Sequence, residues 1–301
     1  MLNSLISFLL ASLLLPWGLG QVSSQNFSTS VSDQNIPQKV DSSSYGILTT
    51  ASNVAVIDLA SGAVLVNRDD RTPVPIASIT KLVTALVLLD SNLNWNDVVT
   101  IRAEDWRDGG RRYLWPDEQI TVHDLFDLSL AASANEAVIA LVRHTGLSEA
   151  EFVQKMNDMV SSLGLNNTHF IEPTGLHHGN VASARDLAVL ADHAFAQADI
   201  ARATRLSELS FTLINNGRVV RAFSTNVLLG SFLNNREYEI VGAKTGFLDE
   251  AGYCLVMTVA KEGEASLTVV ILGSHSKPDR WQEAKGLIDW TYDNYVWPVF
   301  N

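Results

Sequence analysis

The chain contains a single cysteine, Cys254, among its 301 residues. One cysteine cannot form an intrachain disulfide, and its isolation excludes zinc sites built from clustered thiolates. Charged residues are also scarce, at 18% of the chain, and 33 acidic residues outnumber 21 Lys and Arg, for a net charge of −12. An acidic chain attracts neither nucleic acid nor anionic lipid through bulk charge, so we expect no nucleic-acid partner.

The first 20 residues lack charged side chains altogether. An apolar run from Leu5 to Leu15 is followed by Pro16 and small residues, a pattern typical of a secretory signal peptide, although the usual Lys or Arg before the run is missing. An uncleaved anchor is the alternative, but the run is shorter than the ~20 apolar residues that a spanning helix needs. We predict a signal peptide over residues 1–20 and a secreted, periplasmic or otherwise extracytoplasmic protein.

Large apolar side chains are few in residues 21–45, which are rich in Ser, Gln and Asn. A segment of this composition cannot bury enough apolar surface to fold alone, so it predicts a flexible tether. The remaining residues, 46–301, are numerous enough for one domain with a substantial core.

Strand patterns occur near both ends of this domain. Apolar runs at 54–58 and 63–67 flank a short turn and predict a hairpin. Runs rich in β-branched residues at 252–260 and 266–272 flank the turn 261–264 and predict a second hairpin.

Helical patterns fill the middle of the domain and its end. Residues 76–89 are apolar enough for a buried helix, and Ser148 with Glu151 forms a capping box. Ser183 is a third helix start, and residues 279–295 carry apolar side chains at helical spacing. The order predicts an α/β (α+β) fold, in which an antiparallel sheet flanked by helices contains an inserted helical lobe.

The first candidate for chemistry is Ser78-Ile-Thr-Lys81. Residues three apart on a helix share a face, so the Lys amine can reach the Ser hydroxyl. Burial lowers the pKa of a Lys and lets it act as a base for a nucleophilic Ser. The alternative is a helix cap and a surface Lys, and Ser274-His-Ser-Lys277 has the same spacing.

The second candidate, Ser133-Ala-Asn135, offers a hydroxyl that could relay a proton and an amide that could hold a substrate carbonyl. A helix cap is the alternative, and two further Ser-x-Asn triplets begin at residues 24 and 224. The third candidate, Lys244-Thr-Gly246, occurs once. On an exposed strand edge it would bind a carboxylate, whereas an ordinary turn is the alternative.

The three patterns together resemble the active-site-serine, penicillin-binding family of D-Ala-D-Ala peptidases, which carries S-x-x-K, S-x-N and K-T-G in this order. The likeness covers about residues 54–295 and is specific to the low-molecular-mass carboxypeptidase and endopeptidase branch. It is carried by the stretches 53–62, 77–82, 167–176, 183–187 and 244–255.

The resemblance implies a role for each motif residue. Ser78 would be the acylated nucleophile, Lys81 the general base and Ser133 the proton relay. The backbone N–H groups of Ser78 and Phe247 would form the oxyanion hole. Substrate would be bound by Asn135, Lys244, Thr245, Gly246 and Phe247.

Two departures from the branch concern substrate choice and attachment. Many carboxypeptidases of the branch carry an Arg before K-T-G that can meet a free substrate carboxylate, where this chain has Thr225-Asn226. Its loss leaves room for an endopeptidase that cuts cross-links. The chain also stops at Asn301, without the second domain and amphipathic anchor of many relatives, so we expect no strong membrane anchor.

Other residues are weaker candidates. His177-His178 fits no metal-ligand spacing, so we expect no metal and no cofactor. Cys254 falls in a predicted strand as an inert buried thiol. Residues 106–115, with three Arg and two Gly, predict a surface loop at the rim of a substrate groove. Glu172 resembles the deacylating Glu of class A β-lactamases, but in this family the position is not catalytic.

We therefore predict a penicillin-sensitive serine D-Ala-D-Ala peptidase, a carboxypeptidase, an endopeptidase or both. Its partners would be peptidoglycan stem peptides and β-lactams. Two alternatives remain. A β-lactamase needs a deacylation base that we do not identify, and a catalytically silent wall-binding protein has no need of five intact motif residues.

Overall fold

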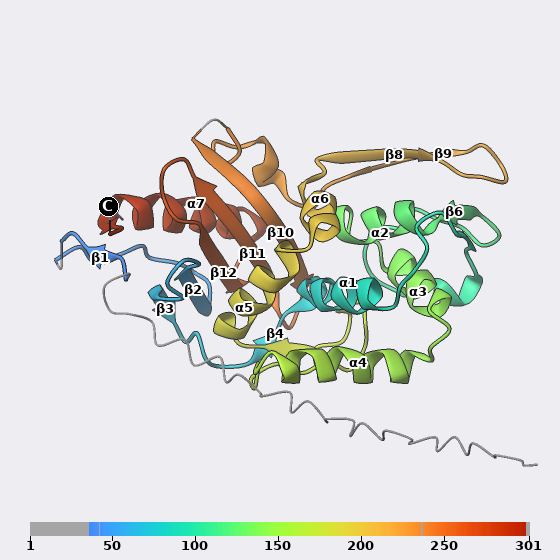
Figure 1. Cartoon of the computed structure of the whole chain (residues 1–301), viewed down its shortest axis with the longest axis horizontal. Coiled ribbons are helices and arrows are strands. Elements are labelled where there is room, and N and C mark those ends of the chain that lie inside the picture. Colours follow the sequence, from blue (N-terminus) through green and yellow to red (C-terminus); the bar gives the residue numbers. More distant parts are fainter. Residues whose placement is uncertain (1–35, 42, 236, 299–301) are drawn as a thin grey trace, which may run out of the picture. The chain divides into compact units, whose positions relative to one another are not determined.

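A five-stranded antiparallel sheet supports the fold in the computed structural model, which describes residues 36–298 except 42 and 236 (Figure 1). The strands in spatial order are β10 (Tyr238–Leu248), β11 (Gly252–Lys261), β12 (Leu267–Ser274), β2 (Asn53–Asp58) and β3 (Val64–Arg68). The two predicted hairpins are confirmed as β2–β3 and β11–β12. Pairing of β12 with β2 joins the beginning and the end of the domain.

Both faces of the sheet are covered, because successive side chains of a strand point to opposite faces. On one face, Leu255 and Met257 join an apolar cluster with α7 (Lys277–Asn294). On the other face, Cys254 and Val256 join a larger cluster that includes α5 (Ala184–Phe195). Burial on both faces explains why the central strands are nearly continuous apolar runs.

The predicted helical lobe is inserted between β3 and β10. Besides α5 it contains α1 (Lys81–Asp90), α2 (Val122–Ala131), α3 (Asn135–His144), α4 (Glu149–Ser162) and α6 (Ala198–Arg205). The capping box is confirmed, since Ser148 and Glu151 satisfy each other's backbone N–H groups at the start of α4. Ser183 caps α5 through the N–H of Asp186, as predicted. These local signals set where the helices begin.

Short elements complete the described chain. Paired strands are β1 (Gln38–Lys39) with β13 (Tyr295–Val296), β4 (Val74–Pro75) with β7 (Val181–Ala182), β5 (Val98–Thr100) with β6 (Gln119–Thr121), and β8 (Glu208–Thr212) with β9 (Val219–Phe223). The 3₁₀ turns are η2 (Ala77–Thr80), η3 (Ala103–Asp105) and η4 (Val227–Gly230).

The N-terminal predictions are only partly covered by the described residues. The predicted signal peptide lies outside them. At the end of the predicted tether, Gln38 and Lys39 pair with the last residues of the domain, while the boundary at residue 46 stays a prediction. No helix in the described part of the chain is long and apolar enough to span a membrane.

The junction between the sheet and the lobe brings the three motifs together. β10 is one of the two outer strands of the sheet and contacts both η2 and α6. The first motif begins in η2 and continues into α1, and the second lies between α2 and α3. The third lies within β10, so it is part of a strand and not the turn of the alternative interpretation.

Candidate active site

Ser78 and Lys81 are brought together by a tight turn of the backbone. Ser78 lies in η2, and Lys81 is the first residue of α1. A 3₁₀ turn has three residues per turn, so side chains at i and i+3 eclipse each other. Lys81 Nζ accordingly lies 3.0 Å from Ser78 Oγ, to which it donates a hydrogen bond. Ser78 caps no helix, and its side chain is partly exposed.

Lys81 is buried, with 1% of its surface exposed. Its Nζ also donates to Asn135 Oδ1 at 2.7 Å and to the Thr174 carbonyl oxygen at 2.6 Å. Burial disfavours the ammonium and lowers the pKa of Lys81 to about 7, against the opposing charges of Glu172 and Glu136. A sizeable fraction of the molecules therefore carries a neutral amine at neutral pH, which is what a general base requires.

Ser133 lies between α2 and α3 with a φ of +61°. A left-handed conformation is unfavourable for a residue with a Cβ and is concentrated at functional sites. Its Oγ accepts a hydrogen bond from Lys244 Nζ at 2.9 Å. Lys244 is also buried, and its pKa is held well below the usual value first by burial, then by the charges of Lys81 and Arg280.

Asn135 begins α3 but does not cap it through its side chain. Its Oδ1 accepts from Lys81, and its Nδ2 donates to the Gly109 carbonyl oxygen at 2.9 Å. The amide therefore connects the base to the loop that follows η3. Its role in holding a substrate carbonyl stays a prediction.

The third motif lies directly against the turn that carries the nucleophile. Thr245 Oγ1 donates to Thr225 Oγ1 at 2.7 Å, so Thr225 lies beside the motif. A Cβ on Gly246 would lie 2.6 Å from the Ile76 carbonyl oxygen and 3.2 Å from the Ser78 nitrogen. The absence of a side chain at Gly246 thus lets β10 approach the nucleophile's own backbone, and its contact with substrate stays a prediction.

A cleft of about 500 Å³ lies over these residues. It is lined by Ser78, Ser133, Asn135, Thr225, Thr245, Gly246 and Phe247, among others. Gly110, Arg111 and Tyr113 also line it, so the loop predicted as a rim does reach the groove. None of the described lining residues is acidic, although the chain as a whole carries a net charge of −12. Such a cleft favours a substrate that carries carboxylates.

Phe247 follows the third motif and has an exposed side chain that stacks at a tilt on Tyr253, with 4.4 Å between ring centroids. Both rings line the cleft. The contribution of its backbone N–H to an oxyanion hole stays a prediction.

Arg280 is a cleft residue that the sequence did not reveal. It lies on the buried side of α7, and its Nη1 donates to the carbonyl oxygens of Gly246 and Cys254, each at 3.1 Å. Burial lowers the pKa of Arg280 to about 10. The only sequence signal is a cation beside the apolar stripe of that helix, which also fits a residue that reaches the surface.

The competing candidates are occupied elsewhere. Ser274 ends β12 and donates to Glu283 at 2.6 Å, and no hydrogen bond joins it to Lys277 among the described residues. The second Ser-x-x-Lys pair is therefore not a nucleophile and base, although Lys277 itself lines the cleft. Cys254 is buried, and burial raises the pKa of its thiol to about 11, as expected for an inert cysteine. The carboxylate of Glu172 accepts hydrogen bonds from its own segment.

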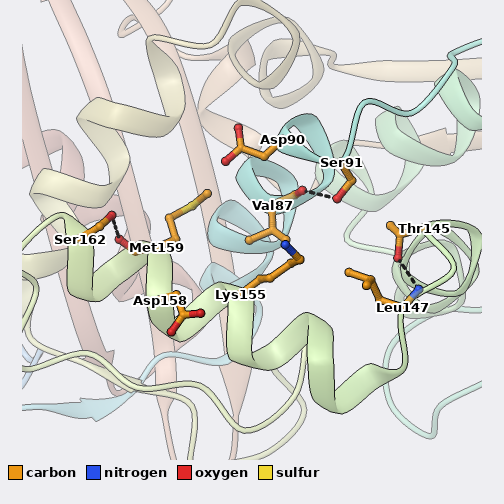
Figure 2. A pocket seen from close by; sticks show the side chains of 9 residues that line it. All are labelled: Val87, Asp90, Ser91, Thr145, Leu147, Lys155, Asp158, Met159 and Ser162. Carbon is orange, nitrogen blue, oxygen red and sulfur yellow. Dashed lines mark hydrogen bonds between the residues drawn. The ribbon is translucent and has the colours of Figure 1, made fainter. Parts of the chain in front are cut away.

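A second cavity, of about 560 Å³, lies between the end of α1 and α4 (Figure 2). Its serines make local bonds, Ser91 to the Val87 carbonyl oxygen and Ser162 to the Met159 carbonyl oxygen, both at 2.7 Å. Both are hydrogen bonds to backbone carbonyl oxygens within one helical turn, and neither places a serine hydroxyl beside a general base. The arrangement supports no nucleophilic chemistry there.

Comparisons with known proteins agree with this geometry. A family profile described as D-alanyl-D-alanine carboxypeptidase matches residues 40–276. The chain is 33% identical over 237 residues to a D-alanyl-D-alanine endopeptidase of Pseudomonas aeruginosa, covering 78% of this chain and 75% of that protein. It is 29% identical over 259 residues to the D-alanyl-D-alanine carboxypeptidase DacF of Bacillus subtilis, covering 81% and 63%.

A solved structure is similar over most of the domain. The DD-transpeptidase of Streptomyces K15 superimposes with a TM-score of 0.77 at 26% identity, covering 83% of this chain and all of that one. The antiparallel sheet with its helical lobe is therefore the fold of this DD-transpeptidase. With the profile match over residues 40–276, these relatives show that the chain belongs to the D-alanyl-D-alanine carboxypeptidase family.

Proposed function

We propose that the chain is a serine-type D-Ala-D-Ala peptidase that cleaves peptidoglycan stem peptides outside the cytoplasm through an acyl-enzyme on Ser78. The observation that carries the proposal is the buried Lys81 amine, which lies 3.0 Å from Oγ of the partly exposed Ser78 at the cleft. A nucleophile and a base in hydrogen-bond contact are the minimum that covalent catalysis requires.

Acylation follows from these contacts. Neutral Lys81 removes the proton from Ser78 Oγ, which attacks the carbonyl carbon of the penultimate D-Ala. The oxygen of the tetrahedral intermediate is stabilised by the backbone N–H groups of Ser78 and Phe247. The proton that Lys81 took from Ser78 passes to the leaving amine through Ser133, whose Oγ accepts a hydrogen bond from Lys244. The C–N bond then breaks, and the acyl group stays on Ser78.

Deacylation uses the same groups with water as the nucleophile. Water loses a proton to the base, its oxygen adds to the ester carbon, and Ser78 Oγ leaves and recovers a proton. β-Lactams acylate Ser78 in the first step because their ring presents a reactive amide with an adjacent carboxylate. Glu172 does not resemble a deacylating base here, because its carboxylate is bound to backbone N–H groups. This favours the peptidase over a β-lactamase.

The substrate range that we propose includes cross-linked stem peptides as well as free ends. Thr225 lies beside Thr245 in the cleft and brings no cation to a terminal carboxylate. Arg111, Lys277 and Arg280 also line the cleft, and of these Arg280 has its Nη1 engaged by the carbonyl oxygens of Gly246 and Cys254. Relatives named carboxypeptidase and relatives named endopeptidase both match the chain.

Labelling with a fluorescent penicillin tests the proposal. We expect stable labelling of the native protein, no labelling of Ser78→Ala, and unchanged labelling of Ser274→Ala, which alters the matched second pair. Rapid loss of the label would indicate a β-lactamase, and no labelling of the native protein would indicate a silent wall-binding protein. Digestion of purified monomeric and dimeric muropeptides then defines the substrate range.

A further inference from the structure

Glu172 lies in the segment between α4 and α5 and closes a turn of the backbone with its carboxylate. Its Oε2 accepts from Thr174 N at 2.7 Å and from Thr174 Oγ1 at 2.5 Å. Its Oε1 accepts from Gly175 N at 2.5 Å and Leu176 N at 2.9 Å. An ionised carboxylate only accepts hydrogen bonds and has about four lone-pair sites, so it matches a turn that presents only donors.

The three residues of this turn contact three parts of the active site. The Thr174 carbonyl oxygen accepts from Lys81 Nζ at 2.6 Å. Gly175, with a φ of +87°, lies against the backbone that carries the nucleophile, because a Cβ there would overlap the Ala77 carbonyl oxygen. Leu176 lines the cleft. A change in the turn would therefore reach the base and the nucleophile together.

Asn180 connects Glu172 to the nucleophile's turn by a second route. Its Nδ2 donates to Glu172 Oε1 at 3.0 Å and to Thr80 Oγ1 at 3.1 Å. Thr80 Oγ1 in turn donates to the Ala77 carbonyl oxygen at 2.8 Å. The Asn180 carbonyl oxygen accepts from Ile76 N at 3.1 Å, just before η2.

We propose that Glu172 is a positioning residue for acylation, which holds the Thr174 carbonyl against Lys81 and so fixes the base over Ser78. The inference rests on the proposed function, because it requires Lys81 to be the base. Among the described residues, no hydrogen bond joins Glu172 to Lys81 or Ser78 directly, so Glu172 acts through the turn and is not itself a catalytic residue.

The charges around Lys81 provide a measurement, the pH dependence of acylation, that distinguishes this role from a general loosening of the fold. Lys81 is faced by Glu172, by Glu136 of α3 and by Lys244 of β10. Glu136 is buried and accepts from Tyr113 N. Both carboxylates stabilise the ammonium and raise the pKa of Lys81 against the effect of burial. Removing the Glu172 charge lowers that pKa, so the rise of acylation rate with pH moves to lower pH.

The experiment measures the acylation rate with fluorescent penicillin across pH for three variants of the full chain. Glu172→Gln keeps the shape but turns an amide group toward N–H donors. Glu172→Asp keeps the charge and shortens the reach. Asp186→Asn is the matched control, because Asp186 accepts from Asn167 N at 2.8 Å and Thr168 Oγ1 at 3.0 Å at the start of the same segment.

We expect Glu172→Gln to lower the acylation rate at the high-pH plateau about tenfold, as for one lost hydrogen bond to a charged group. We also expect the midpoint of the rise of acylation rate with pH to move to lower pH. Glu172→Asp should lower the plateau and keep the midpoint near the native value. Asp186→Asn should leave both near native.

Three results would overturn the inference. The first is a native profile for Glu172→Gln, and the second is an equal fall for Glu172→Gln and Asp186→Asn without a shift of midpoint. The third result applies if circular dichroism shows that Glu172→Gln is unfolded. In that case a Glu172→Asp variant that is folded and keeps the native plateau rate would overturn the inference. Failure of the native protein itself to be labelled would refute the proposed function instead, and this inference with it.

Discussion

Replacement of the proposed base, Lys81→Met, should make the protein inactive and more stable. Burial lowers the pKa of Lys81 from 10.5 to about 7, so folding at pH 7 requires the side chain to lose much of its hydration as a cation. The linkage between that pKa shift and stability corresponds to roughly 4 kcal/mol at pH 7. Methionine is unbranched and of similar length, so it fills the same space without a charge.

Lost hydrogen bonds offset part of this gain. Asn135 Oδ1 and the Thr174 carbonyl oxygen would both lose the Lys81 donor, and we take about 1 kcal/mol for each, the lower end of the cost of an unpaired buried acceptor. The net gain is then about 2 kcal/mol, or roughly 4–8 °C in melting temperature for a domain of this size.

The pH dependence separates this explanation from a general packing effect. The folded-state pKa lies below the unfolded one, so the unfolded chain binds more protons between about pH 7 and 10.5. The native protein therefore gains stability as pH rises through that window, and the advantage of Lys81→Met should be largest below pH 7 and should shrink toward pH 10.

Thermal unfolding followed by circular dichroism from pH 6 to pH 9.5 is the measurement. Lys155→Met is the control, because Lys155 is exposed on α4 and its replacement should change stability by less than about 0.5 kcal/mol (Figure 2). A Lys81→Met variant that melts below the native protein, or an advantage that does not shrink with rising pH, would refute the reasoning.

Three further predictions concern activity. The rate of acylation by penicillin should rise about thirtyfold between pH 5.5 and 8.5, because Lys81, with a pKa of about 7, loses its proton in this range. A flat pH profile, measured by quenching the labelling reaction at timed intervals, would contradict the role of Lys81 as base. Gly246→Ala should slow acylation at least about tenfold, because its Cβ would lie 2.6 Å from the Ile76 carbonyl oxygen, whereas Gly230→Ala, whose Cβ meets open space, should not. Thr225→Arg should shift preference from dimeric toward pentapeptide muropeptides by about ten- to a hundredfold in competition assays; an unchanged ratio would show that residue 225 does not meet the terminal carboxylate.

Much of the fold was accessible from local chemistry. The hairpins, the capping box of Ser148 and the start of α5 at Ser183 depend on neighbouring residues, and all are as predicted. The β8–β9 hairpin and α6 went unpredicted. The pairing of β1 with β13 joins segments that are far apart in the sequence, so no local pattern predicts it.

The active-site contacts also fall into local ones, which the sequence predicts, and distant ones, which it does not. Spacing alone predicts that Lys81 reaches Ser78, because a helical turn brings them together. The placement of Arg280 beside Gly246 and of Thr174 against Lys81 depends on how α7 and the segment before α5 pack on distant elements. Glu172 illustrates the difference, because its sequence context suggests a resemblance to a β-lactamase residue, whereas its contacts show a carboxylate that organises a turn.

The pairing of β12 with β2 also governs when the domain can fold. Ala55 pairs with Val270 across most of the length of the chain, so the sheet has a high contact order. Contacts this distant form late, because the entropy of closing the loop must be overcome before they stabilise anything. Until β12 and α7 are present, β2 lacks its second neighbouring strand and the helix that covers Val54 and Val56. A chain that is still being synthesised therefore cannot complete its sheet. The Lys81–Ser78 pair gains its rigid setting only after the strands of the second half of the domain are present.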